Sequence, residues 1–329
     1  GWFAWASNGW VLGGDRTLSG KPIVANDPHL PHMLPSIVFQ QHLRCPGLEV
    51  IGATVPGLPL VLMGHNRKVA WGMTSAVADA IDLYIERLDS ANPGMVVGPD
   101  GPEKIVEQKL VILVREGDEM HERVRKVRRT PRGPLINDLY PELLPEWSPL
   151  ISVHAGVLDA GRSIMGLRDG NRAASVEELR RAMLPMASPI NTIMAADDAG
   201  TIALFATGRI PDRRNHRGTF PVPAWSKDYT WEEFLDAEEM PFGKGEGADY
   251  FAHGNSLMVD PEHSEVLFQI DSAPSYRMDR IREMIEAVDK HGPGSIARIQ
   301  GDAVLHRGRK IAPYMTEDLG AIDDLNEVE

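Results

Sequence analysis

The sequence has almost no cysteine, no long apolar segment and no excess of basic residues. Its 329 residues include a single cysteine, Cys45, which excludes a disulfide within the chain. No stretch approaches the roughly 18 consecutive apolar residues that a membrane-spanning helix requires. The net charge is −13, whereas binding to phosphates needs clustered Lys and Arg. We therefore expect neither a membrane span nor a nucleic-acid partner.

The start of the chain also lacks the features of a targeting segment. Residues 1–6, GWFAWA, have no basic start and no full apolar stretch, so they do not form a signal peptide. No motif with a histidine points to Cys45, which favours a packed thiol over a catalytic one. A hydrophobic content of 43% is enough for a sizeable core, in one large or two ordinary domains.

The stretch from Ser7 to His29 predicts a hairpin. Two short apolar runs, VLGG and PIVAND, are typical of strands, and the RTLSGK between them is typical of a turn. Such a hairpin returns the chain towards its start and brings His29 near Ser7. A serine and an imidazole in this arrangement form a plausible nucleophile and base, although Ser, His and Gly are also common loop residues.

Further along, the pattern predicts many antiparallel strands and then helices. Residues 10–90 are mostly β, and residues 104–130 predict a long hairpin. Ser175 with Glu178 predicts a helix start, as does Thr230 with Glu233. A longer helix is expected from Ser275 to a stop at Gly292, with another over residues 295–315. Strands followed by helices indicate a layered architecture with two stacked sheets.

The order of these motifs resembles the penicillin acylase (penicillin amidase) family. SNGWVLGG, SGKPIVANDPHL, LPSIVFQQHL, PGLEVIGATVPGLPLVLMGHN and VAWGMT carry the resemblance, which runs from Ser7 to about Pro313. Members are N-terminal-nucleophile amidohydrolases, which include penicillin, cephalosporin and acyl-homoserine-lactone acylases. The resemblance implies an α+β fold with four αββα layers. It implies that residues 1–6 end a spacer, that residues 7–315 form the catalytic domain, and that residues 316–329 are an acidic tail.

Ser7 is the nucleophile that the resemblance implies, freed by cleavage between Ala6 and Ser7. A serine hydroxyl is a poor nucleophile until a base accepts its proton. A free α-amine has a pKa of about 7.7–8.0 and can act as that base, whereas an amide within an intact chain cannot. The expected activity is hydrolysis of an amide between an acyl chain and an amine, such as a β-lactam nucleus or a homoserine lactone. No organic cofactor is needed.

The resemblance assigns roles to four further residues. His29 matches a histidine of cephalosporin and acyl-homoserine-lactone acylases that holds the amine or hydroxyl of the nucleophile. Two donors form the oxyanion hole, the backbone N–H of Ser75 and the side-chain amide of Asn255, although the family usually has two consecutive asparagines at the latter position. Arg280 matches an arginine that supports the site electrostatically. Three of these residues have a plain alternative: a turn residue for His29 and Asn255, and a solvated helix residue for Arg280.

The resemblance also implies a structural calcium ion and a second subunit. Asp79, the Ile81 carbonyl, Asp82 and the Gly218 carbonyl match calcium ligands in relatives, and carboxylates with a carbonyl in a loop suit a hard cation. Catalytic chains of the family extend well beyond 329 residues and pair with a smaller α subunit cut from the same precursor. The chain is therefore expected to be a portion of the catalytic β subunit of a periplasmic or secreted enzyme.

Two alternatives remain open at this point. A non-catalytic relative that keeps the fold but is not cleaved would act as a binding or structural module. A metal-dependent hydrolase would use Asp27, His29 and His32 in DPHLPH as zinc ligands, although the prolines make that spacing irregular.

Overall fold

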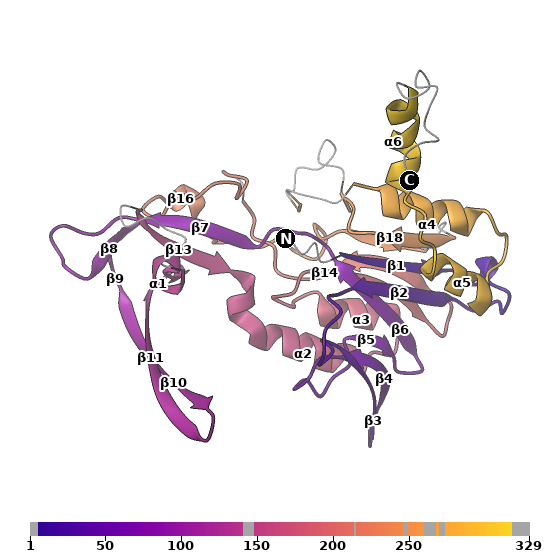
Figure 1. Cartoon of the computed structure of the whole chain (residues 1–329), viewed down its shortest axis with the longest axis horizontal. Helices are drawn as coiled ribbons and strands as arrows, with labels where there is room; N and C mark the ends of the chain where they lie inside the picture. Colours follow the sequence, from indigo (N-terminus) through magenta and orange to yellow (C-terminus); the bar gives the residue numbers. More distant parts are fainter. Residues whose placement is uncertain are drawn as a thin grey trace, which may run out of the picture.

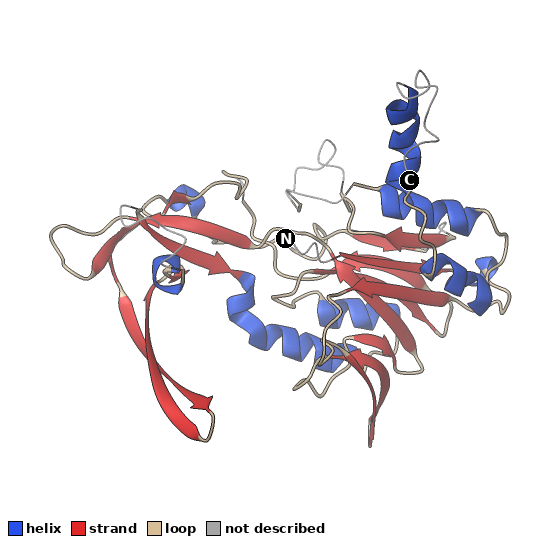
Figure 2. Cartoon of the chain, in the orientation of Figure 1, coloured by secondary structure: helices blue, strands red, loops and turns tan. Residues whose placement is uncertain are grey.

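The computed structural model describes residues 6–140, 148–213, 215–245, 249–259, 268–269 and 274–317. Most of the spacer segment, residues 1–5, and most of the acidic tail, residues 318–329, lie outside the described residues. The described part combines antiparallel sheets with helices that lie on their outer faces (Figures 1 and 2). In that part no helix is both long and apolar enough to cross a membrane.

The larger sheet has seven antiparallel strands and lies at the centre of the fold. Its order is β17 (Phe242–Lys244), β15 (Ile202–Ala206), β14 (Asn191–Asp197), β6 (Val69–Ser75), β5 (Met63–His65), β4 (Leu48–Thr54) and β3 (Phe39–Cys45). Strand β14 is buried along its whole length, because Ile193 and Ala195 on one face and Met194 and Ala196 on the other join two different apolar clusters.

A smaller sheet carries the beginning of the described chain. Its order is β18 (Tyr250–His253), β1 (Ala6–Leu12) and β2 (Ile23–His29), all antiparallel. The β1–β2 hairpin confirms the predicted strand–turn–strand, with a short 3-10 turn over Gly14–Arg16. The smaller sheet packs on the larger one through an apolar cluster of Val11, Met194, Ala196 and Ile202.

Helices cover the outer face of each sheet. Helices α2 (Ala160–Gly170) and α3 (Val176–Met183) pack on the larger sheet, where Leu179 and Met183 join Trp71 and Phe205 in one core. Helices α4 (Tyr276–Glu286) and α5 (Pro293–Gln300) pack on the smaller sheet, where Ile281, Ile285 and Ile296 meet Trp10 and Leu12. Helix, sheet, sheet and helix are the four αββα layers that the resemblance implied.

An arm of β structure extends from these layers (Figure 1). Strands β13 (Leu150–Ala155), β7 (Ile81–Glu86) and β16 (Val222–Pro223) form its base, with β7 and β16 parallel. The predicted long hairpin is present as β10 (Val106–Glu116) and β11 (Glu119–Thr130), which ends against β12 (Gly133–Pro134) and α1 (Ile136–Leu139). A short hairpin, β8 (Met95–Gly98) with β9 (Gly101–Lys104), and 3-10 turns at Gly156–Asp159 and Lys227–Tyr229 complete it.

The helix start at Ser175 is confirmed, because its hydroxyl accepts a hydrogen bond from the N–H of Glu178. The helix expected after Thr230 is wrong. The Thr230 hydroxyl donates to the Lys227 carbonyl and closes the preceding 3-10 turn instead of capping a helix. Cys45 is exposed at the end of an edge strand, so the expectation of a packed thiol is also wrong.

Two predicted helix boundaries are wrong as well. Gly292 caps the start of α5 rather than stopping α4, which ends at Glu286. A proline follows Gly292, and proline is well suited to the first helical position. The helix expected over residues 295–315 is divided into α5 and α6 (His306–Glu317), with a break from Gly301 to Leu305.

Candidate active site

Ser7 lies on the face of β1 that points towards the larger sheet. Residues opposite each other in an antiparallel pair share a face, so Ser7, Gly9 and Val11 lie on one side with Pro28, Asn26 and Val24. Gly9 shows how close the second sheet is, since an added Cβ would lie only 1.9 Å from the methyl carbon of Met194. Ser7 is buried, and its hydroxyl donates to the Ala6 carbonyl oxygen at 2.6 Å.

Asn255 joins the two sheets at Ser7. Its Oδ1 accepts a hydrogen bond from the Ser7 N–H at 2.7 Å, and its Nδ2 donates to the Ser75 carbonyl at 2.9 Å. These partners assign the amide, because an N–H requires an oxygen and a carbonyl requires an N–H. The backbone of Asn255 has a φ of 62°, a left-handed conformation that asparagine tolerates better than most residues. The structure thus brings Ser7, Ser75 and Asn255 together.

Arg277, rather than Arg280, is the arginine at this cluster. Its guanidinium donates to the Ser7 carbonyl at 2.8 Å, to Asn8 Oδ1 at 2.8 Å and to Asn255 Oδ1 at 2.9 Å. Burial lowers the pKa of Arg277, while the charge of Asp27 acts in the opposite sense. The guanidinium of Arg280 instead pairs with Asp302 and Glu283. The two arginines are three residues apart on α4, and only the packing of that helix decides which one reaches Ser7.

His29 lies beside the Ala6–Ser7 junction but bonds to other residues. It is paired with Ala6 across the hairpin, on the face opposite that of Ser7. Its Nε2 lies 3.0 Å from Asp27 Oδ2 and 3.4 Å from Asn8 Nδ2. The expected contact between this imidazole and the nucleophile is therefore not made in the uncleaved chain.

The zinc alternative finds no support in this geometry. Asp27 and His29 are adjacent, whereas His32 lies beyond the end of β2 beside a cavity. Among the described residues there is no group of three or more His, Cys, Asp or Glu side chains arranged to hold a metal ion.

Asn26 is a second polar link between the sheets that sequence reasoning missed. Its Nδ2 donates to the carbonyls of Asn8 and Met73, and its Oδ1 accepts from the Met73 N–H. Gly72 leaves room for it, because a Cβ there would lie 2.8 Å from the Asn26 side chain. This link holds the strand that ends at Ser75 against the hairpin that carries Ser7.

His253 is a third missed residue, and it bridges both expected halves of the oxyanion hole. Its Nδ1 lies 2.6 Å from Thr74 Oγ1, and its Nε2 lies 3.1 Å from the Ser256 carbonyl. The carbonyl requires a proton on Nε2, so in the neutral ring Nδ1 carries no proton and accepts from the Thr74 hydroxyl. Burial lowers the pKa of His253 to about 4; the bond to Ser256 opposes this effect and the charge of Arg277 adds to it. His253 thus positions the neighbours of Ser75 and Asn255.

The neutral ring of His253 predicts an acid-sensitive fold. The unfolded state has the higher histidine pKa, so it binds more protons, and the free energy of unfolding falls as the pH drops from about 6.5 towards 4. The full loss is on the order of 3 kcal/mol. In the uncleaved precursor, H253Q is expected to flatten this decrease in urea-unfolding curves measured from pH 7 to pH 4. H121Q on the exposed β11 is the control, and an equal flattening there would contradict the assignment to His253.

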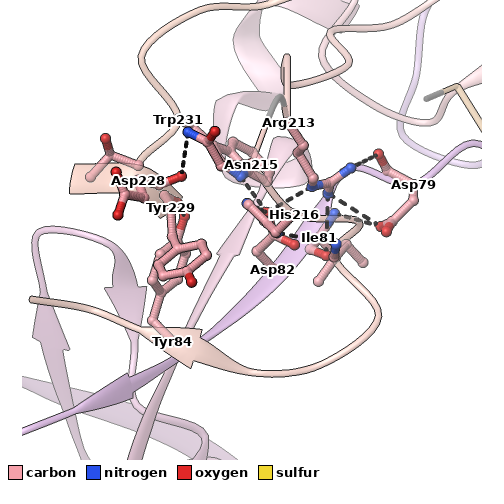
Figure 3. A network of polar contacts seen from close by, with 12 residues as sticks. Asp79, Ile81, Asp82, Tyr84, Arg213, Asn215, His216, Asp228, Tyr229 and Trp231 are labelled. Atoms are coloured by element: carbon pink, nitrogen blue, oxygen red, sulfur yellow. Dashed lines mark hydrogen bonds and ion pairs between the residues drawn. The ribbon is translucent and has the colours of Figure 1, made fainter. Parts of the chain in front are cut away.

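The four residues expected to bind calcium lie close together, but an arginine lies among them. Gly218 is close to both carboxylates, since a Cβ there would lie 2.8 Å from Asp82 Oδ1 and 2.9 Å from Asp79 Oδ2. The guanidinium of Arg213 bonds to Asp82 and to the carbonyls of Asp79 and Ile81 (Figure 3). Calcium needs about six to eight oxygen ligands. With the N–H groups of Arg213 directed at these oxygens, the residues present do not fit a calcium ion.

A cavity of about 1060 Å³ opens between the hairpin and the larger sheet. Pro28, directly opposite Ser7 in the strand pair, lines it together with Asn26 and Val24 from the same face of β2. The rest of the lining is mainly apolar and includes Leu30, Met33, Ile37, Val38, Met63 and Trp71. The cavity can accept an apolar group, and it lies on the Ser7 face of the hairpin.

Comparisons with known proteins agree with this arrangement. The family model described as penicillin amidase matches residues 2–328. The chain belongs to the penicillin amidase family. It is 30% identical over 305 residues to an acyl-homoserine lactone acylase, QuiP, of Pseudomonas aeruginosa, which covers 90% of this chain and 35% of that protein. It is 30% identical over 299 residues to the penicillin acylase 2 proenzyme of a Pseudomonas species, which covers 91% and 38%.

A solved penicillin G acylase has the same fold. The thermostable penicillin G acylase of Alcaligenes faecalis superposes with a TM-score of 0.78 at 20% identity, over 96% of this chain and 56% of that one. This match confirms the α+β fold with four layers, and the family model confirms the family. The chain spans about a third to two fifths of the curated relatives it matches.

Proposed function

We propose that this chain is the nucleophile-bearing portion of an acylase, an amidohydrolase that cleaves the bond between an acyl group and an amine. The observation that carries the proposal is the contact between the backbone N–H of Ser7 and Asn255 Oδ1. This oxygen already accepts a hydrogen bond from the nitrogen that would become the terminal amine. Relatives named as acylases support the same reaction class.

Cleavage would start from the contact between Ser7 and the preceding carbonyl. Ser7 Oγ lies 2.6 Å from the Ala6 oxygen, so it is also close to the carbonyl carbon. Attack of Oγ on that carbon forms an ester, and the C–N bond to Ser7 breaks as the nitrogen takes a proton. Water then hydrolyses the ester and leaves Ser7 with a free α-amine. Departure of Ala6 removes the partner of His29 in the strand pair and exposes the imidazole to the new terminus.

The mature site would use the same contacts for an external amide. The α-amine accepts the proton of Ser7 Oγ as the hydroxyl attacks the substrate carbonyl. Arg277 donates to the Ser7 carbonyl, and its charge disfavours protonation of the nearby amine. The Ser75 N–H and the Asn255 amide would hold the oxyanion once Nδ2 leaves the Ser75 carbonyl. The amine product leaves, and water hydrolyses the acyl-enzyme.

The cavity would hold the acyl group. Pro28 connects it to Ser7 through the strand pair, and its mainly apolar lining favours an aliphatic or aromatic acyl chain. The amine half, either a β-lactam nucleus or a homoserine lactone, would lie outside the cavity. A smaller subunit from the same precursor, which would contribute to the acyl pocket, and a periplasmic or secreted location remain part of this proposal.

The proposal is tested with the full precursor and a panel of amides. The assay measures release of the amine from phenylacetyl, glutaryl and long-chain acyl amides of the two amine classes. Mass spectrometry measures the masses of the chains that the precursor yields. A chain starting at Ser7, together with turnover of at least one amide, is the expected result. An uncleaved precursor without turnover would favour the non-catalytic alternative.

A wider side chain in the cavity is expected to change acyl preference. M63W places an indole in the cavity wall and should lower kcat/KM for long acyl chains by about 10-fold or more, in line with the effect of one or two methylenes in an apolar pocket. Short acyl chains should retain their rates. M120W, on the exposed hairpin, is the matched control. Equal loss for short and long chains would contradict the assignment of the cavity to the acyl group.

A further inference from the structure

Arg213 occupies the centre of the acidic cluster at the start of the β arm. Its side chain is 1% exposed and that of Asp82 is 2% exposed, so both charges are removed from water. The Arg213 Nε donates to Asp82 Oδ2 at 2.8 Å, and Nη1 donates to the Asp79 carbonyl at 3.0 Å. Nη2 lies 3.5 Å from the Ile81 carbonyl and 3.5 Å from Asp79 Oδ1. One cation thus reaches both carboxylates and both carbonyls (Figure 3).

Aromatic groups enclose this pair. Trp231 donates its indole N–H to the same Asp82 oxygen, and its ring centroid lies 5.6 Å from the Arg213 guanidinium carbon. The imidazole of His154 stacks on the Trp231 ring, with the two ring centroids 4.1 Å apart. Arg213 therefore supplies positive charge where two carboxylates face each other.

The same oxygens would be needed by a divalent cation. An ion at Asp79, Asp82 and the Ile81 carbonyl would have to displace the Arg213 hydrogen bonds and would be repelled by the guanidinium. Removal of Asp82 from water is costly without a partner, and Arg213 provides that partner from within the chain.

We infer that Arg213 is the resident cation of this site and that the chain binds no divalent metal ion there. The guanidinium of Arg213 links the segment that carries Gly218 and Trp231 to the start of β7. Asp79, one of its partners, lies four residues after Ser75 in the chain. This link does not depend on the free calcium concentration.

The first test uses metal analysis and thermal unfolding of the full precursor. The purified protein is expected to contain no stoichiometric calcium, and its Tm should be the same in EDTA and in millimolar calcium chloride. A bound calcium ion whose removal by EDTA lowers the Tm would overturn the inference.

The second test removes the internal cation. R213A leaves two carboxylates facing each other, and its Tm in EDTA should fall by roughly 5–15 °C. Millimolar calcium should recover part of this loss, whereas the double variant R213A/D82N should not respond to calcium. R128A is the matched control, because it breaks an ion pair between an arginine and one carboxylate, that of Asp138. An R213A protein with an unchanged Tm, or with one that ignores calcium, would overturn the inference.

Discussion

S7A is expected to abolish both cleavage of the precursor and turnover of amides. Without Oγ there is no atom to attack the Ala6 carbonyl or an external amide, and the loss of kcat should be at least about 10⁴-fold, as for other nucleophile deletions. The substitution removes one short hydrogen bond and adds no volume, so the fold should be retained. Intact mass and the rate of amine release measure the two effects separately.

S19A is the matched control for the nucleophile. Ser19 lies in the exposed turn between β1 and β2, so the same atom is removed from the same hairpin without touching the junction. It should be cleaved and should turn over amides like the unaltered protein. The assignment of Ser7 would be wrong if a fully matured S7A preparation still hydrolysed amides at the normal rate.

Substitution of Asn255 is expected to have the second-largest effect. The side chain accepts from Ser7 and Arg277 and donates to Ser75, so its loss leaves several buried polar groups unpaired. Each unpaired group costs about 1–3 kcal/mol of stability. Loss of one oxyanion donor lowers kcat by about 10²–10³-fold. N255A should therefore lower kcat of the matured protein by at least that factor and also slow cleavage.

N255G separates the side chain from the backbone at this position. Asn255 has a φ of 62°, which glycine adopts without strain and alanine does not. N255G should recover part of the stability lost in N255A but none of the kcat. If N255G restored the rate as well, the side-chain amide would have no role in catalysis. N92A, in an exposed turn, controls for the loss of an asparagine as such.

Local patterns predicted the part of the site that lies within one hairpin. Ser7 and His29 are close because two short strands and a turn bring them together, and this geometry depends on neighbouring residues alone. The helix start at Ser175 was predictable for the same reason. The failures at Thr230 and Gly292 arose where a short motif suits two structures, and packing selected the other one.

Motifs in the amino-acid sequence were sufficient to assign the family, the hairpin that carries Ser7 and the succession of strands and helices. Which side chains meet at Ser7 depends instead on how the layers pack against each other. Arg277 and Arg280 belong to the same helix and have the same chemistry, and the docking of α4 on the smaller sheet selects Arg277. The tertiary structure likewise places Arg213 beside Asp82, 131 residues away in the chain. Contacts between distant segments depend on how the layers pack, and a short sequence motif does not predict that packing.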